Sequence, residues 1–251
     1  MRRVRLTLEY DGTEFFGFQL QGLGHRTVQG EIEAALLKIT GKAIRVSGAG
    51  RTDTGVHALG QVCHFDVDWG ITENKIAGAL NANLPRDLSV REARWAEEGF
   101  HCRYSATSRT YRYAILNRPQ PSALLQRFVW HLVKPLDTGA MQDAGRVLLG
   151  VHDFATFGQA NSPEKSTTRY LERLEVRRYR QCVLITVRGN AFLRQMVRSL
   201  VGTLALAGQG KLTQSDVEVI LQSRDRRKCP SVAPAQGLCL VRVGYDGERL
   251  T

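Results

Sequence analysis

The stretch from residue 47 to residue 64, SGAGRTDTGVHALGQVCH, gathers reactive side chains among very small ones. It carries Arg51, Asp53, His57 and His64, with glycines at positions 48, 50, 55 and 60. Glycine adopts positive φ angles at little cost and lets a backbone approach a ligand closely, so this spacing predicts a sharply turning loop. We expect Asp53 to perform chemistry as a carboxylate and Arg51 to handle an anionic substrate.

Flanking apolar patterns predict the elements that position this loop. Residues 44–46 read as the end of a buried strand, and 61–67 as the strand that follows the loop. Upstream, residues 4–10 alternate as a strand, and a helix of period three to four runs from its cap at Thr27 to Gly41. A helix at 72–80 and a strand at 88–95 complete the order β-α-β-β-α-β, that of a ferredoxin-like split unit.

A second glycine-spaced loop, DGTEFFGFQLQGLGHRT, holds three phenylalanines at positions 15, 16 and 18. These rings could pack beneath the active loop or stack on bases, and packing is the favoured interpretation. We expect His57 and His64 to orient the loop or to pack, because their spacing with one aspartate forms no helical zinc motif.

The segment FHCRYSATSRTYRYAILN, residues 100–117, alternates basic and aromatic side chains. Such a strand suits RNA, since arginines hold phosphates while rings stack on unpaired bases. An ordinary strand with its tyrosines inward and its arginines in water explains the pattern equally well, and both interpretations stay open. Residues 118–122 are expected to form a loop.

The second half also alternates strand and helix. Strands are expected at 128–133, 170–177 and 183–187, helices at 138–149, 190–208 and 215–222, and a terminal strand within 233–245. In the long helix at 190–208, Arg198 lies well off the apolar face and is free to reach another element or a ligand.

Charge points to nucleic acid. The 251-residue chain has a formal net charge of +11, and arginines outnumber lysines by 28 to 7. Arginine binds phosphate through two parallel hydrogen bonds and stacks on bases, although codon usage in a GC-rich genome would also raise its share.

Other features of the sequence indicate the cell compartment and argue against some kinds of site. Five cysteines are scattered, with no pair at the two-residue spacing of metal or redox sites, which favours a reducing compartment and no structural metal. No signal peptide is expected, and the longest apolar run, 200–207, is too short to cross a bilayer. A cytoplasmic protein without a membrane partner is the prediction.

Five motifs in order resemble the TruA family of tRNA pseudouridine synthases over nearly the whole chain: GAGRTDTGVHA at 48–58, RTYRY at 109–113, GVHDF at 150–154, NAFLRQMVRSLVG at 190–202 and APAQGLCL at 233–240. The opening YDGTEFFGFQLQ also looks like that family's first motif. Three positions depart from it: Phe18 replaces a tryptophan, Leu20 a commonly basic residue and Thr54 a more usual alanine. These departures affect details of RNA packing.

The resemblance implies an α+β pseudouridine synthase fold. Two ferredoxin-like-type domains, 1–104 with the aspartate loop and 105–251, would be joined by a central antiparallel sheet with a cleft between them. It implies a homodimer that converts uridine to pseudouridine at tRNA positions 38, 39 and 40, in the anticodon stem-loop. The family reaction breaks the C1'–N1 bond, rotates the base and rejoins it through C5, with no metal or other cofactor.

Residue by residue, the resemblance makes Asp53 the catalytic aspartate, a nucleophile or base. Arg51 would engage the flipped-out nucleotide and the RNA backbone, and Tyr111 would stack on the target base. Arg198 would pair with the catalytic carboxylate, and Leu238 would line the pocket. A base in the anticodon stem must be extruded before a carboxylate reaches its sugar, and the arginines and aromatics would offset that cost.

Two alternatives remain at this stage. A non-catalytic tRNA-binding protein would keep the fold without the reaction, and a hydrolase would use the aspartate and histidines of the loop. Asp53 together with Arg51, Tyr111 and Arg198 argues against the first. The sequence shows no metal cluster, serine elbow or phosphate loop, which weakens the second.

Overall fold

The computed structural model describes residues 1–22, 24–160, 162 and 164–246. The chain forms two compact units, Met1–Thr107 with Leu240–Thr251, and Ser108–Cys239. The sequence-based division into 1–104 and 105–251 stays a prediction.

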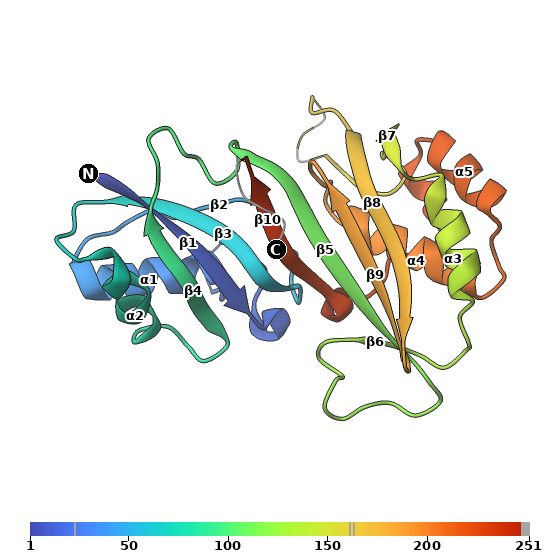
Figure 1. Cartoon of the computed structure of the whole chain (residues 1–251), viewed down its shortest axis with the longest axis horizontal. Coiled ribbons are helices and arrows are strands. Elements are labelled where there is room, and N and C mark those ends of the chain that lie inside the picture. Colours follow the sequence, from blue (N-terminus) through green and yellow to red (C-terminus); the bar gives the residue numbers. More distant parts are fainter. Residues whose placement is uncertain (23, 161, 163, 247–251) are drawn as a thin grey trace. The chain divides into compact units, whose positions relative to one another are not determined.

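The first unit has the predicted order of strands and helices. Its elements are β1 (Arg2–Tyr10), α1 (Val28–Thr40), β2 (Ser47–Gly48), β3 (His57–Val67), α2 (Glu73–Asn81) and β4 (Leu88–Trp95), with a 3-10 turn at Gly12–Glu14. β1 pairs antiparallel with both β3 and β4, and β2 pairs antiparallel with β3. Strand β10 (Leu238–Tyr245) lies beside β3, and α1 and α2 cover one face of the sheet (Figure 1).

Helix α1 begins and ends where its capping residues predict. The Thr27 hydroxyl accepts a hydrogen bond from the Gly30 N–H at 3.2 Å, and Gly41 closes the helix with a φ of 68°. Its buried residues, Val28, Ile32, Ala35 and Leu36, recur at helical spacing. The predicted helix is confirmed.

The predicted strand at residues 44–46 is wrong. The Val46 N–H donates to the Glu33 carboxylate of α1 at 3.0 Å, so it is not available to a neighbouring strand. Pairing starts only at Ser47, opposite His64, and lasts two residues. Val46 is nevertheless buried, which explains its apolar character without a strand.

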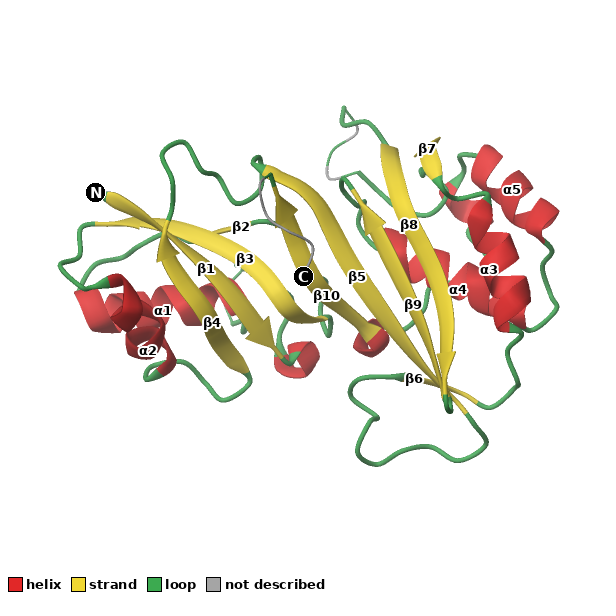
Figure 2. Ribbon diagram, in the orientation of Figure 1, coloured by secondary structure: helices red, strands yellow, loops and turns green. Residues whose placement is uncertain are grey.

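The second unit is also α+β. It holds β5 (Ala106–Asn117), β6 (Trp130–Leu132), α3 (Thr138–Arg146), β7 (Gly150–Asp153), β8 (Thr168–Tyr179), β9 (Cys182–Gly189), α4 (Met196–Gly208) and α5 (Gln214–Gln222). β5, β9, β8 and β7 pair in that order as antiparallel neighbours, and β6 runs parallel to β5. Figure 2 shows the helices α3, α4 and α5 gathered on one side of β8 and β9.

Helix α4 starts six residues later than predicted. Arg194 exchanges two backbone hydrogen bonds with Gln159, at 3.1 and 3.3 Å, so its N–H and C=O cannot join a helical ladder. Gln195 then takes a left-handed conformation, with a φ of 61°, before the helix begins at Met196. A pairing distant in sequence therefore overrides the helical pattern of residues 190–195.

Strand β5 is also shorter than the basic and aromatic segment that suggested it. Residues 100–105 form a tight turn, in which the Ser105 N–H donates to the His101 carbonyl at 2.9 Å. The strand begins at Ala106.

Both units pack helices on sheets whose pairings are mostly antiparallel, so the α+β class is confirmed. Among the described residues, no helix has the length and apolar character needed to span a bilayer.

Candidate active site

Asp53 lies at the start of a tight turn between β2 and β3. The Val56 N–H donates to the Asp53 carbonyl at 3.1 Å, and Gly55 supplies the positive φ of 77° that closes the turn. The Asp53 side chain is half-buried, whereas that of Arg51, two residues earlier, is exposed. The predicted glycine-dependent loop is confirmed, and it presents both side chains from one short segment.

Buried polar groups fix the backbone on either side of Arg51. The Gln61 side-chain amide donates to the Gly50 carbonyl at 3.0 Å, and the Thr52 hydroxyl lies 2.9 Å from the Tyr10 hydroxyl. Gln61 and Tyr10 belong to strands β3 and β1, so the sheet itself anchors the loop. Sequence reasoning did not single out these two residues, although a glutamine inside an apolar strand was the signal that could have found Gln61.

The phenylalanine-rich loop packs against the Asp53 loop. Phe15 and Phe18 are almost fully buried, and the Phe18 N–H donates to the Thr52 carbonyl at 3.2 Å. A Cβ on Gly17 would come within 2.5 Å of the same carbonyl oxygen. Packing, the favoured interpretation, is therefore confirmed for these two rings, while Phe16 remains 45% exposed.

His57 ties the two loops together. Its Nδ1 accepts a hydrogen bond from the Gly12 N–H at 3.0 Å, and its side chain is buried. A Cβ on Gly12 would meet the Val56 carbonyl oxygen at 2.1 Å, so only glycine allows this approach. The expected orienting role of His57 is confirmed.

In the second unit, Arg198 and Tyr113 hold the segment that precedes β10. The Arg198 Nε donates to the Ala233 carbonyl at 2.7 Å, and the Ala233 N–H donates to the Arg198 carbonyl at 3.0 Å. The Tyr113 hydroxyl donates to the Pro234 carbonyl at 2.8 Å, and burial raises the pKa of that hydroxyl. Arg198 thus reaches another element, as predicted, and the segment that it holds leads to the buried Leu238.

The tyrosines of strand β5 lie on its buried face. Tyr111 and Tyr113 are buried, and the ring of Tyr111 makes an edge contact with Phe192 at 5.2 Å between centroids. Arg112, between them, is exposed. Within β5 the pattern is that of an ordinary half-buried strand, whereas Tyr104, in the turn before it, is 79% exposed.

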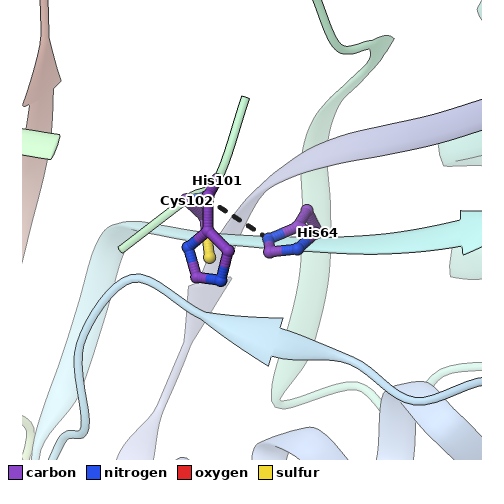
Figure 3. Close-up of side chains that lie close together, drawn as sticks. All are labelled: His64, His101 and Cys102. Atoms are coloured by element: carbon purple, nitrogen blue, oxygen red, sulfur yellow. Dashed lines mark hydrogen bonds between the residues drawn. The ribbon is translucent and has the colours of Figure 1, made fainter. Parts of the chain in front are cut away.

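A cluster of His64, His101 and Cys102 is the one group of metal-ligating side chains found among the described residues (Figure 3). Nδ1 of each histidine accepts a backbone N–H, from Cys102 at 3.4 Å and from Arg103 at 3.2 Å. Each neutral ring therefore carries its proton on Nε2, where it is a donor and not a ligand. Burial, with Arg3 and His101 nearby, lowers the pKa of His64 to about 4.

The predicted site residues thus fall into two groups. Arg51 and Asp53 share the loop of the first unit, and Tyr111, Arg198 and Leu238 belong to the second. Within each unit, backbone contacts distant in sequence hold these residues in place.

Comparison with known proteins identifies the family to which the chain belongs. The profile of a protein family described as tRNA pseudouridine synthase matches residues 7–105 and 144–246. The chain belongs to the tRNA pseudouridine synthase family. The matched residues of this family include Arg51, Asp53, Arg198 and Leu238, while Tyr111 lies between the two matched segments.

Relatives of the family resemble the chain over almost its full length. A tRNA pseudouridine synthase A of Caulobacter vibrioides is 47% identical over 246 residues, covering 98% of this chain and 99% of its own. Proteins of the same name from Rhodopseudomonas palustris and Brevibacillus brevis are 45% and 44% identical, and each match covers 98% of this chain and 100% of the relative.

Proposed function

We propose that this protein is an isomerase that converts uridine to pseudouridine in tRNA. The observation that carries the proposal is identity of 47% over almost the full length of a relative named tRNA pseudouridine synthase A. The chemistry of the Asp53 loop is compatible with it, because a carboxylate with anchored flanking backbone is what a nucleophile or base requires.

The reaction is balanced without an added reactant. The bond between ribose C1' and N1 of the base breaks, the base turns, and C1' bonds to C5, while C5 loses a proton and N1 gains one. Asp53 acts as the nucleophile or base of this sequence. The isomerisation is neither a redox reaction nor a net hydrolysis, so it requires one well-placed carboxylate and a site that excludes bulk water.

Four further residues complete the proposal as substrate contacts. Arg51, exposed beside Asp53, engages the extruded nucleotide and its phosphates. Tyr111 stacks on the target base, Arg198 keeps the catalytic carboxylate ionised, and Leu238 contributes an apolar wall. The burial of Tyr111 and Leu238 supports roles for both in a water-poor pocket.

The proposal extends to substrate position and assembly. Uridines 38, 39 and 40 of the anticodon stem-loop are the targets, and the active protein is a cytoplasmic homodimer that needs no cofactor. The target positions, the homodimer and the lack of a cofactor come from the motif resemblance, whereas the cytoplasmic location comes from the scattered cysteines of the sequence. Carbodiimide treatment followed by primer extension maps the modified positions, and sedimentation equilibrium gives the oligomeric state.

Release of tritium tests the reaction itself. Purified protein is incubated without cofactor with tRNA that carries tritium at uridine C5, and label appearing in water is counted. Isomerisation releases one tritium for each pseudouridine formed. Tight tRNA binding without release from any tRNA would support the non-catalytic alternative instead.

A further inference from the structure

Tyr104 ends a stack of rings that runs from the core of the first unit to its surface. The ring of Tyr104 lies on that of His101, with centroids 4.4 Å apart and planes tilted by 36°. The rings of His101 and His64 make an edge contact, with centroids 4.7 Å apart, and His64 is buried in β3. The Tyr104 side chain is nevertheless 79% exposed.

Hydrogen bonds hold this stack in place. The N–H groups of Arg103 and Tyr104 both donate to Nδ1 of His101, at 3.2 and 3.4 Å, and the His101 N–H donates to the Ser105 hydroxyl at 3.0 Å. The inner end of the cluster, drawn in Figure 3, is held by the bond from the Cys102 N–H to His64. The outermost ring is therefore displayed on a rigid turn.

The charges around the stack favour an anionic, aromatic ligand. Burial, with Arg3 and Arg103 nearby, lowers the pKa of His101, so the ring beneath Tyr104 is neutral at physiological pH. Arg103, adjacent in the chain, is exposed. A neutral π surface beside a cation matches a nucleobase together with its phosphate.

Exposure alone would not distinguish Tyr104, because single exposed aromatic residues are ordinary. Tyr179, at the end of β8, is 65% exposed and has Arg180 at 5.6 Å from its ring. It makes no ring–ring contact with any described residue. Tyr179 therefore shares the exposure and the neighbouring arginine of Tyr104 but not the supporting stack, which makes it a matched control.

We propose that Tyr104 is a stacking platform for an unpaired base of tRNA, outside the predicted set of substrate-binding residues. This inference rests on the proposed function for the identity of its ligand. A ring already fixed by His101 loses little freedom when a base stacks on it, so the contact contributes directly to affinity.

Binding of tRNA to four variants of the full chain tests the platform. The probes are an in vitro transcribed tRNA with uridines at positions 38–40 and a single-stranded oligouridylate. Tyr104→Ala and Tyr104→Leu are expected to raise Kd about 5- to 100-fold, because stacking on the ring is lost. Tyr104→Phe and the control Tyr179→Ala should stay within about twofold of the unaltered protein.

The salt dependence separates stacking from a charge effect. Each phosphate contact contributes to the slope of log Kd against log salt concentration, whereas a ring contact does not. The Tyr104→Leu variant should bind more weakly with an unchanged slope. An unchanged Kd for Tyr104→Leu would overturn the platform, as would a slope that falls with affinity.

The two RNAs distinguish failure of this inference from failure of the proposed function. Tritium release by the unaltered protein, with normal tRNA binding by Tyr104→Ala and Tyr104→Leu, would leave the function standing and remove the platform. Absence of release, with binding of tRNA and of oligouridylate that depends on the Tyr104 ring, would do the reverse. The Leu and Phe variants decide the question if Tyr104→Ala does not fold.

Discussion

At the scale of single residues, the backbone around Asp53, the proposed catalytic residue, is held by other residues. Gln61 and Tyr10 bond the residues on either side of Arg51, and the Val56 N–H closes the turn on the Asp53 carbonyl. Groups outside residues 51–53 therefore help to hold the loop that carries Asp53.

Asp53→Asn should lower kcat by roughly a thousandfold or more, because the amide keeps the shape of the carboxylate but is neither a nucleophile nor a base. The Kd for tRNA should stay within about threefold. Tritium release and filter binding measure the two quantities, and Asp68→Asn, an exposed residue beyond β3, is the matched control. Lost folding or lost binding would instead assign Asp53 a structural role.

Protonation of His64 should lower the stability of the folded protein in acid. Its pKa lies near 4 in the folded protein, below the 6.5 of an exposed histidine, because burial and the nearby Arg3 disfavour its protonated form. Between these two values the unfolded chain binds more protons than the folded one. The stability that neutral His64 contributes is complete above pH 6.5 and is lost as pH falls toward 4.

His64→Asn should therefore flatten the fall in unfolding free energy between pH 6.5 and pH 4. Asparagine keeps an acceptor near the Cys102 N–H but does not titrate. His101, whose pKa is also lowered, should preserve part of the dependence of the unfolding free energy on pH. The pKa of Asp66, which is paired with Arg3, is lowered from 3.8, so Asp66 contributes to the pH dependence in a more acidic range. Urea unfolding at four pH values measures the effect. An unaltered slope in His64→Asn would contradict this account.

At the scale of elements, the phenylalanine-rich loop supports the Asp53 loop through close backbone contact. Gly17 has a φ of 85°, and a Cβ there would come within 2.5 Å of the Thr52 carbonyl oxygen. The two loops cannot move apart easily, because Phe15 and Phe18 are buried beneath them. The position of Asp53 therefore depends on a glycine 36 residues earlier in the chain.

Gly17→Ala should lower the free energy of unfolding by roughly 2–4 kcal/mol, through backbone strain and steric overlap together, and should reduce kcat. Gly41→Ala is the control for strain alone. Gly41 has a similar φ of 68° but nothing within 4 Å of its Cβ position, so it should cost only about 1 kcal/mol with kcat unchanged. Equal losses in the two variants would show that the loops can separate.

Elements with local signals could be predicted from the sequence, and those set by distant contacts could not. Helix α1 follows from Thr27, Gly41 and its apolar spacing, and β4 occupies the predicted residues 88–95. The strand expected at 44–46 failed because Glu33 takes the Val46 N–H. The early start expected for α4 failed because Arg194 pairs with Gln159. The same limit explains why Tyr113 was not identified as an anchor, whereas Gln61, a glutamine inside an apolar strand, carried a local signal.

At the scale of the whole molecule, segments far apart in sequence combine. Residues from Leu240 onward group with the first unit, while Leu238 and Cys239 of the same strand belong to the second. No local pattern in the sequence indicates this division of β10. Net charge, in contrast, is a property that the sequence alone supplies, and it leads to a prediction about the whole surface.

Binding of tRNA should weaken steeply as salt concentration rises, because a protein of net charge +11 neutralises phosphates and releases their counterions. A plot of log Kd against log salt concentration should be linear with a slope of several units. Arg51→Gln should reduce that slope by about one, since one phosphate contact is lost, whereas Tyr179→Ala should not change it. Fluorescence anisotropy of labelled tRNA between about 50 and 300 mM salt measures both. A flat response would mean that the positive charge serves something other than RNA.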